Sequence, residues 1–331
     1  MFFVLALAPA IAVGAETPGP QAIALLRNAF NAPTFAYRGH MTVTHWFGSG
    51  TKSEDVEVWF KPPNSYRWEF LNPDGRVNRV HVRAGDSEVL HMAGQPTVLQ
   101  GKATKATPKQ ISADSEWDLV QKNYQILQVG EGAVAGRKTI VLELSPRAAG
   151  KPKQQFWIDP DSGVILAIKR FREGGHLAIY SRFTEFQQGP EISDDRFATT
   201  SSSEAATEKH GYDQEFKSLA EFEKQSGNKS RLPAVLPMGF EFESVDTFKS
   251  DSFTVHHFRY TDGMNVVSIF ETTKPSKFAS PSTRTLPASP VGPFQITDTG
   301  YVFQKKVGDR YFTLISDVSQ ESLKTIGLAL K

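Results

Sequence analysis

The chain has 331 residues, room for about two domains of roughly 150 residues each. Lys and Arg total 37 against 36 Asp and Glu, so no net charge draws the chain to nucleic acid, and we expect no nucleic-acid partner. Cysteine is absent, which excludes disulfides, thiolate catalysis, cysteine metal centres and a lipid anchor on an N-terminal cysteine. The 24 Phe, 20 Pro and 25 Gly favour a β-rich protein over a helical bundle.

The N-terminus has the pattern of an export signal. Phe2 to Ala15 is uncharged and apolar, and the chain turns polar at Glu16. This pattern predicts a signal peptide over residues 1–15, cut after Val13-Gly14-Ala15, since about 14 residues are too few to span a bilayer core of about 30 Å. A buried N-terminal helix is the alternative. No later segment reaches 18 apolar residues, so we expect an exported, soluble protein.

The mature chain opens with a predicted amphipathic helix over 20–30, and then the apolar period changes from helical spacing to two. The alternation predicts antiparallel strands at 56–60, 66–70, 80–82, 88–92, 124–129, 138–144, 154–158, 164–171 and 177–186, with a helix at 116–122. We therefore expect eight or nine strands between residues 35 and 187.

The second half of the chain predicts a linker and a smaller domain. Residues 198–231 are rich in Ser, Ala, Glu and Lys and read as a linker, with a helix in its middle at 214–224. Residues 232–331 predict strands near 253–260, 265–272, 301–307 and 310–316, a proline-rich loop at 274–293, and a last helix capped by Ser319. The fold class is α+β, with a large antiparallel sheet over 16–197 followed by a small antiparallel sheet with one helix.

The motifs that could carry chemistry are better explained as turns. Gly130, Gly132 and Ala135 spell G-x-G-x-x-A, but a predicted strand follows where a dinucleotide loop needs a helix. Asp159 to Gly163 begins like a calcium loop and lacks its later glutamate. The eight histidines show no metal-ligand spacing, and no G-x-S-x-G motif occurs. Carboxylate pairs for glycoside cleavage stay open, although nothing in the sequence singles one out. Because no motif gives positive evidence for catalysis, we expect no enzyme, no cofactor and no metal site.

The predicted strands carry more apolar and aromatic residues than one sheet face needs. Along 164–171 and 177–186 both faces are apolar, whereas one or two short helices can cover only one face. The other face is left to close on itself, to meet the second domain, or to hold an apolar ligand. An ordinary sandwich core is the competing interpretation.

Several motifs resemble those of a known family. The run from Val58 to Phe70 resembles the second hairpin of the bacterial lipoprotein carrier superfamily, and Phe156 to Gly163 with Phe183-Thr184-Glu185-Phe186 resembles its last strands. Four further segments resemble the RseB/MucB branch, the periplasmic regulators of sigma-E: Asn123-Tyr124-Gln125, Val134 to Lys138, Leu236 to Phe240 and Tyr260 to Gly263. The resemblance covers roughly residues 20–197 and 232–331.

This resemblance implies an open, LolA-like half-barrel with short helices, whose concave face accepts acyl chains, and a small C-terminal domain. It implies a periplasmic protein that senses lipid or lipoprotein and binds the periplasmic domain of an RseA/MucA-like anti-sigma factor, shielding it from proteolysis in the envelope stress response. The lipid-binding residues we expect are Val58, Phe60, Tyr66, Trp68, Phe70, Val80 and Val82. The partner-binding residues and the oligomeric state stay open.

A lipoprotein or lipid carrier of the LolA type is the alternative function, and an unrelated hydrolase is a distant third. The carrier commonly has an arginine that helps to hold its cavity shut, where this chain has Pro62. This departure makes a shuttling carrier less favoured.

Overall fold

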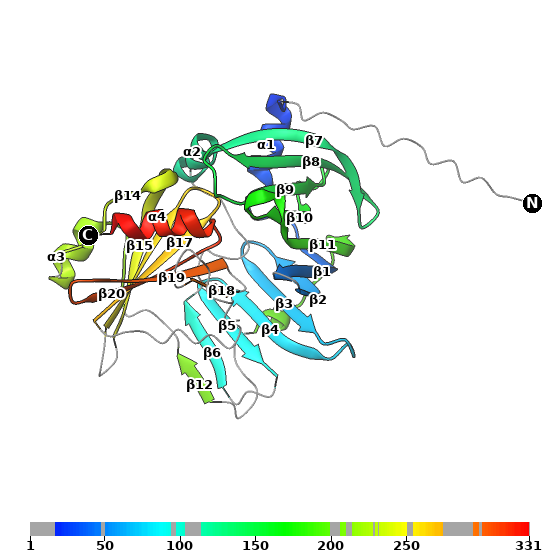
Figure 1. Cartoon of the computed structure of the whole chain (residues 1–331). Coiled ribbons are helices and arrows are strands. Elements are labelled where there is room, and N and C mark those ends of the chain that lie inside the picture. Colours follow the sequence, from blue (N-terminus) through cyan, green and yellow to red (C-terminus); the bar gives the residue numbers. More distant parts are fainter. Residues whose placement is uncertain are drawn as a thin grey trace, which may run out of the picture.

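The computed structural model describes residues 17–47, 50–93, 97–102, 114–198, 206–209, 214–227, 229–230, 232–249, 254–273, 294–297 and 300–330. Two open sheets form the molecule, and the small sheet lies beside the large one (Figure 1). The large sheet has 12 strands in the order β12-β6-β5-β4-β3-β2-β1-β11-β10-β9-β8-β7. Neighbouring strands are antiparallel except at one edge, where β12 runs parallel to β6.

Short turns connect most neighbours in the large sheet, which is why its order follows the chain in two runs joined at β1 and β11. Its strands are β1 (Tyr37–Phe47), β2 (Gly50–Lys61), β3 (Ser65–Leu71), β4 (Val77–Ala84), β5 (Ser87–Met92), β6 (Thr97–Lys102), β7 (Tyr124–Val134), β8 (Arg137–Pro146), β9 (Lys153–Ile158), β10 (Ile165–Phe171), β11 (Leu177–Gln188) and β12 (Ala206–Lys209). Eleven of them, β1 to β11, lie between residues 37 and 188, so the expectation of eight or nine strands was too low.

The small sheet follows the order β13-β15-β16-β17-β20-β19-β18, with β14 paired to β15. Its strands are β13 (Gln214–Phe216), β14 (Val235–Leu236), β15 (Phe240–Lys249), β16 (Thr254–Thr261), β17 (Val266–Thr272), β18 (Phe294–Thr297), β19 (Gly300–Val307) and β20 (Arg310–Ser316). Helices α3 (Leu219–Ser226) and α4 (Gln320–Ala329) pack against it. Ser319 caps α4 as predicted, because its side chain accepts a hydrogen bond from the Ser322 amide.

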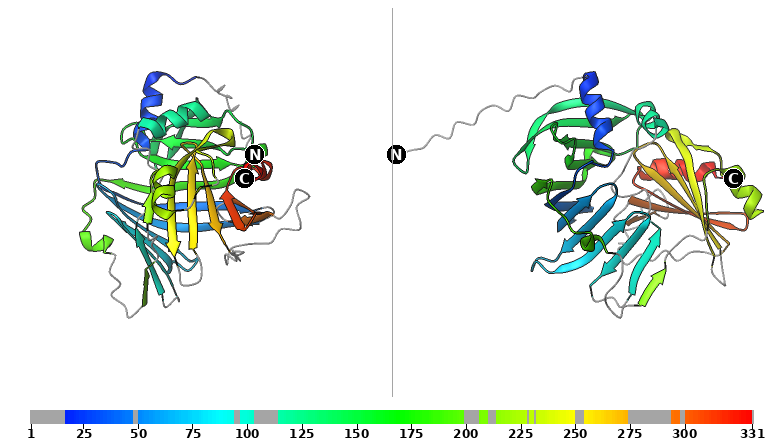
Figure 2. Two further views of the ribbon diagram at one scale, coloured as in Figure 1. Left: turned by 90° about the vertical axis from the view of Figure 1, so that its left-hand side faces the viewer. Right: turned by 180° about the vertical axis from the view of Figure 1, so that it is seen from behind.

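Helix α1 (Pro20–Ala29) covers part of the large sheet together with α2 (Asp114–Asn123). The apolar side of α1 puts Leu26 and Phe30 into a core with Leu142, Phe156 and Ile158. The Phe30 and Phe156 rings meet edge to face with centroids 5.3 Å apart. Figure 2 shows this helix in front of the strands when the molecule is turned by 180°.

Of the two motifs read as turns, Gly130-x-Gly132-x-x-Ala135 is a turn only at its end, because Gly130 and Gly132 lie within β7. Ala135 and Gly136 have φ values of 48° and 74° and connect β7 to β8, which is the geometry of a tight hairpin turn. Asp159 accepts hydrogen bonds from the Asp161 amide and the Ser162 hydroxyl, and it closes the connection from β9 to β10. Hydrogen bonds from Ser162 and Arg137 outweigh burial and hold the pKa of the Asp159 carboxyl below its usual value.

The segment 198–231, expected as a linker, takes part in both sheets. β12 pairs with β6, and β13 pairs with β15. Phe216 and Phe222 are each 1% exposed in the core of the small sheet. The helix expected at 214–224 begins only at Leu219, since Phe216 is held in a strand. The ordered unit around the small sheet therefore begins before residue 232, and it has two helices rather than one.

The proposed signal peptide, residues 1–15, and the proline-rich loop at 274–293 lie outside the described residues. Among the residues that are described, no helix is long and apolar enough to cross a membrane.

Candidate functional site

An apolar face on β2 and β3 holds five of the seven residues expected to bind lipid. In the antiparallel register Val58 lies opposite Trp68, and Phe60 lies opposite Tyr66. Directly opposed residues point to the same side of a sheet, so these four share a face with Phe70. Val58, Phe60 and Tyr66 are 2%, 0% and 5% exposed, whereas Trp68 and Phe70 are half-buried. Only the last two are therefore open to a ligand without movement of the core.

The register places Val80 and Val82 on the opposite face, which corrects the expectation that all seven residues line one concavity. Val82 pairs with Arg67 and Val80 pairs with Glu69. Because successive residues of a strand alternate between faces, neither valine shares a side with Trp68.

That opposite face is covered by the chain itself. The short helix η2 (Asp194–Phe197) lies against β3 and β4. The Arg196 guanidinium lies 3.9 Å from the centroid of the Trp59 ring, and the Arg196 carbonyl accepts a hydrogen bond of 3.2 Å from Arg67. Val82, at 3% exposure, is part of the protein interior.

On the face that carries Trp68, strand β4 contributes Arg79, His81 and Arg83 instead of valines. The Arg79 guanidinium lies 3.8 Å from the centroid of the Phe70 ring, and the His81 ring meets Trp68 edge to face at 5.9 Å. Tyr66, Trp68, His81 and Arg83 line a small hollow. Its volume of about 10 Å³ holds roughly one water molecule. An acyl chain would need this hollow to widen.

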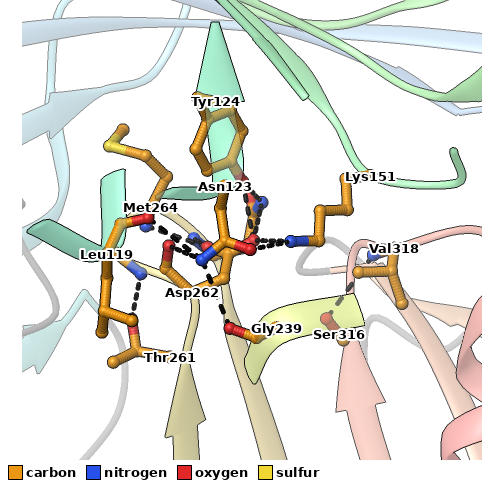
Figure 3. A network of polar contacts seen from close by, with 12 residues as sticks. Leu119, Asn123, Tyr124, Lys151, Gly239, Thr261, Asp262, Met264, Ser316 and Val318 are labelled. Carbon is orange, nitrogen blue, oxygen red and sulfur yellow. Dashed lines mark hydrogen bonds and ion pairs between the residues drawn. The ribbon is translucent and has the colours of Figure 1, made fainter. Parts of the chain in front are cut away.

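A second cluster of polar groups lies where the two sheets meet (Figure 3). The ammonium of Lys151, in the turn before β9, is 2.9 Å from the Asp262 carboxylate in the turn between β16 and β17. Both side chains are 0% exposed. The Tyr124 hydroxyl donates to the same carboxylate at 2.7 Å, and burial, with the Asp262 charge next, raises the pKa of Tyr124. We call Asn123, Tyr124, Lys151, Asp262 and Asn265 the interface network.

The residues of the interface network were not predicted from their chemistry, but several of them lie in segments already singled out in the sequence. Asn123-Tyr124, Gly239-Phe240 and Thr261-Asp262-Gly263 all belong to segments that carried the family resemblance. In the structure the Asn123 side-chain amide donates to the carbonyls of Gly239 and Asp262 at 3.3 and 3.1 Å. Motifs 116 to 139 positions apart thus meet at one point.

Within the described residues no group of three or more His, Asp or Glu side chains could hold a metal ion.

Comparison with known proteins agrees with this architecture. Residues 65–201 match the family model of the MucB/RseB N-terminal domain. The sigma factor AlgU regulatory protein MucB of Pseudomonas aeruginosa is 26% identical over 134 residues, which are 39% of this chain and 42% of that protein. Over these residues the chain resembles the MucB/RseB family. The matched stretch spans less than half of the curated relative's length.

Solved structures of family members extend the match in fold to both sheets. The MucB chain in the complex of Pseudomonas aeruginosa MucA and MucB aligns with a TM-score of 0.56 at 18% identity, covering 94% of this chain and 97% of that one. A crystal structure of MucB aligns with a TM-score of 0.54 at 16% identity, covering 94% and 98%. At these identities the likeness concerns the fold.

Proposed function

We propose that this protein is a periplasmic regulator that binds the periplasmic segment of a MucA-like anti-sigma factor and thereby restrains an envelope-stress sigma factor. The observation that supports it best is the alignment with MucB over 94% of the chain, in a structure that contains MucA. The curated relative is likewise a regulator of a sigma factor. The protein acts by binding, with no catalytic step of its own.

The test of partner binding uses the mature chain and a candidate anti-sigma factor from the same genome. Calorimetric titration of that factor's periplasmic segment should give saturable binding, and a scrambled segment of equal composition is the control. Absence of binding would contradict this proposal and would favour the alternative function, a carrier of lipid or lipoprotein.

We propose further that acyl chains bind on the face of β2 and β3 that carries Val58, Phe60, Tyr66, Trp68 and Phe70. Burying about eight methylenes would contribute roughly 6 kcal/mol at about 0.8 kcal/mol each, less the cost of association. Trp68 and Phe70 are the half-buried members, so they are the first contacts for a chain that widens the hollow.

A matched pair of tryptophan variants tests the acyl site. Trp68→Ala should weaken binding of a fluorescent fatty acid several-fold, whereas Trp59→Ala, on the opposite face beneath Arg196, should leave it unchanged. Equal effects of the two substitutions, or no binding by the unaltered protein, would count against this face.

Export is the remaining part of the proposal, since a periplasmic regulator must leave the cytoplasm. N-terminal sequencing of the protein isolated from its native cells should start at Glu16. An intact Met1 on native protein would contradict it.

A further inference from the structure

The interface network lies on other strands than the face proposed for acyl binding, and it buries an ion pair completely. Moving an ammonium and a carboxylate out of water costs several kcal/mol each. Apolar side chains of similar volume often serve stability as well as such a pair or better. One attested use of a buried ion pair is to specify a single geometry.

The geometry around Lys151 is defined from several sides. Its ammonium is 2.9 Å from the Asp262 carboxylate and donates to the Asn123 side-chain oxygen at 3.2 Å. It also lies 5.0 Å from the centroid of the Phe240 ring, at the start of β15. Asn123 belongs to the large sheet's side, whereas Asp262 and Phe240 belong to the small sheet. Lys151 thus binds both sheets at once.

The Asp262 carboxylate is fixed within the turn between β16 and β17, so the carboxylate and the turn move together. One carboxylate oxygen accepts from the amides of Met264 and Asn265 at 2.9 and 2.7 Å, while the other faces Tyr124 and Lys151. Hydrogen bonds weaken steeply with angle, so a rotation of the turn against the large sheet would break the contacts of Asp262 with Tyr124 and Lys151 together. Apolar contact, which has no direction, would tolerate such a rotation.

A second ion pair joins the two sheets and meets the interface network at Asn265. Arg170 in β10 pairs with Asp317, which lies between β20 and α4, and also donates to the Asn265 side chain. Burial raises the pKa of the Asp317 carboxyl despite the neighbouring Arg170. One attachment alone would permit rotation about itself, whereas two attachments to different elements of the small sheet remove that freedom.

The backbone of the small sheet also lies very close to the large sheet's side at Gly263 and Gly239. A Cβ on Gly263 would lie 2.7 Å from the Val120 amide nitrogen in α2, and a Cβ on Gly239 would lie 2.2 Å from the Asn123 side-chain oxygen. Met264, next to this turn, is 8% exposed in the core that α1 and α2 share with the large sheet. The turn between β16 and β17 is therefore seated in the large sheet's own core.

We propose that the interface network is an orientation lock, in which Lys151 is the positioning residue that fixes the angle between the two sheets. The lock selects one arrangement among those that the apolar contact alone would allow. This inference stands on the geometry of the interface and does not depend on which partner the protein binds.

The experiment measures the distance between the sheets in solution. Because the chain has no cysteine, Val77→Cys in β4 and Leu328→Cys in α4, at positions 40% and 62% exposed, give one spin label on each sheet. Electron–electron double resonance on the full mature chain should give a single narrow distance distribution. Lys151→Met should broaden it, and the amides of Met264 and Asn265 should lose roughly tenfold in hydrogen-exchange protection as Asp262 loses its counter-ion.

Two further variants make the result decisive. Lys153→Met is the matched control, because this nearby ammonium pairs with Glu143 at 3.1 Å within the large sheet, and its distribution should stay narrow. Lys151→Met with Asp262→Leu leaves no lone buried charge, so it should regain thermal stability while the distribution stays broad. A narrow distribution in this double variant would overturn the proposal, since apolar packing would then suffice to fix the angle. Should Lys151→Met alone fail to fold, the double variant decides.

Discussion

Gly150 stands at a position where no side chain fits. Its φ is +80°, and a Cβ there would lie 2.0 Å from the Ser322 Oγ and 2.7 Å from the Ser319 Oγ, at the start of α4. Its carbonyl accepts from the Ser319 amide at 2.6 Å, next to Lys151. We predict that Gly150→Ala lowers the free energy of unfolding by more than the roughly 1 kcal/mol of a left-handed alanine alone.

The control for Gly150 is Gly163, which has a φ of +71° and open space where its Cβ would be. Gly163→Ala carries the same backbone cost without the contact with α4. Thermal unfolding followed by circular dichroism compares the two variants. Equal losses of stability in the two variants would mean that α4 can shift to make room for the new side chain at little cost.

His40 predicts a pH dependence of stability. Burial lowers its pKa, but hydrogen bonds and charge from Glu57, 2.8 Å away, and from Asp55 outweigh burial, so the pKa is raised. A raised pKa in the folded state means that the contribution is complete below the unfolded value of about 6.5 and is lost as pH rises through the folded value.

The stability difference between the native protein and His40→Gln should therefore be larger near pH 6 than near pH 8.5, by roughly the scale of a surface ion pair. Urea unfolding at the two pH values measures it. His81→Gln, which removes a histidine that pairs with Glu88 on β5, is measured at the same two pH values, and its change in stability is compared with that of His40→Gln. A difference for His40→Gln that grows with pH would contradict the assigned direction.

At the residue scale, the sequence could predict which strands carry the apolar side chains but not how they pair. Alternation assigns Val80 and Val82 to one face of their own strand. Whether that face is the one with Trp68 depends on the register between β3 and β4, which also shifts between Phe70 and Leu71. A one-residue change in register reverses every side chain, so two of seven assignments failed together.

Among the elements, α1 owes its place to its buried side rather than to its caps. Gly19 offers no side-chain cap, whereas Leu26 is fully buried against the large sheet. Leu26→Ala should lower the free energy of unfolding by about 2–5 kcal/mol because it leaves a cavity in that core. Leu25→Ala, at a partly buried position of the same helix, should cost less in the same chemical denaturation experiment. The reverse order would mean that α1 is seated differently.

The strands that were not predicted from the sequence are those that form because of tertiary contacts rather than because of a local apolar pattern. β1 shows little alternation of burial, since every residue from His40 to Phe47 is partly exposed. Gly39 in β1 is required there, since a Cβ would lie 2.4 Å from the Glu185 carbonyl oxygen and 2.8 Å from the Phe183 ring. β13 has three residues and is held by Phe216, in a segment whose composition indicated a linker. β15, by contrast, could have been predicted, because its sequence alternates between apolar and charged residues in Phe240-Glu241-Phe242-Glu243.

For the whole molecule, the interface network joins the two sheets by buried polar contacts. A ligand that widens the hollow beside Trp68 acts on β3 and β4, while Arg170 and Lys151 join the other end of the same sheet to the small sheet. If a partner binds across both sheets in one orientation, any ligand that disfavours that orientation must weaken the partner, and by reciprocity the partner weakens the ligand equally.

We therefore predict that a saturating fatty acid lowers the affinity for the anti-sigma segment roughly 5- to 150-fold, a coupling of about 1–3 kcal/mol. Calorimetric titration with and without the fatty acid measures it, and titration of the fatty acid with and without the segment must return the same factor. Trp68→Ala should keep partner binding and lose most of the lipid effect. Lys151→Met with Asp262→Leu should bind both ligands while their coupling shrinks, because the sheets no longer share one orientation. Full coupling in that variant would mean that the apolar contact around Met264, rather than the ion pair, couples the two ligands. No coupling in the unaltered protein would mean that the fatty acid does not regulate binding of the partner.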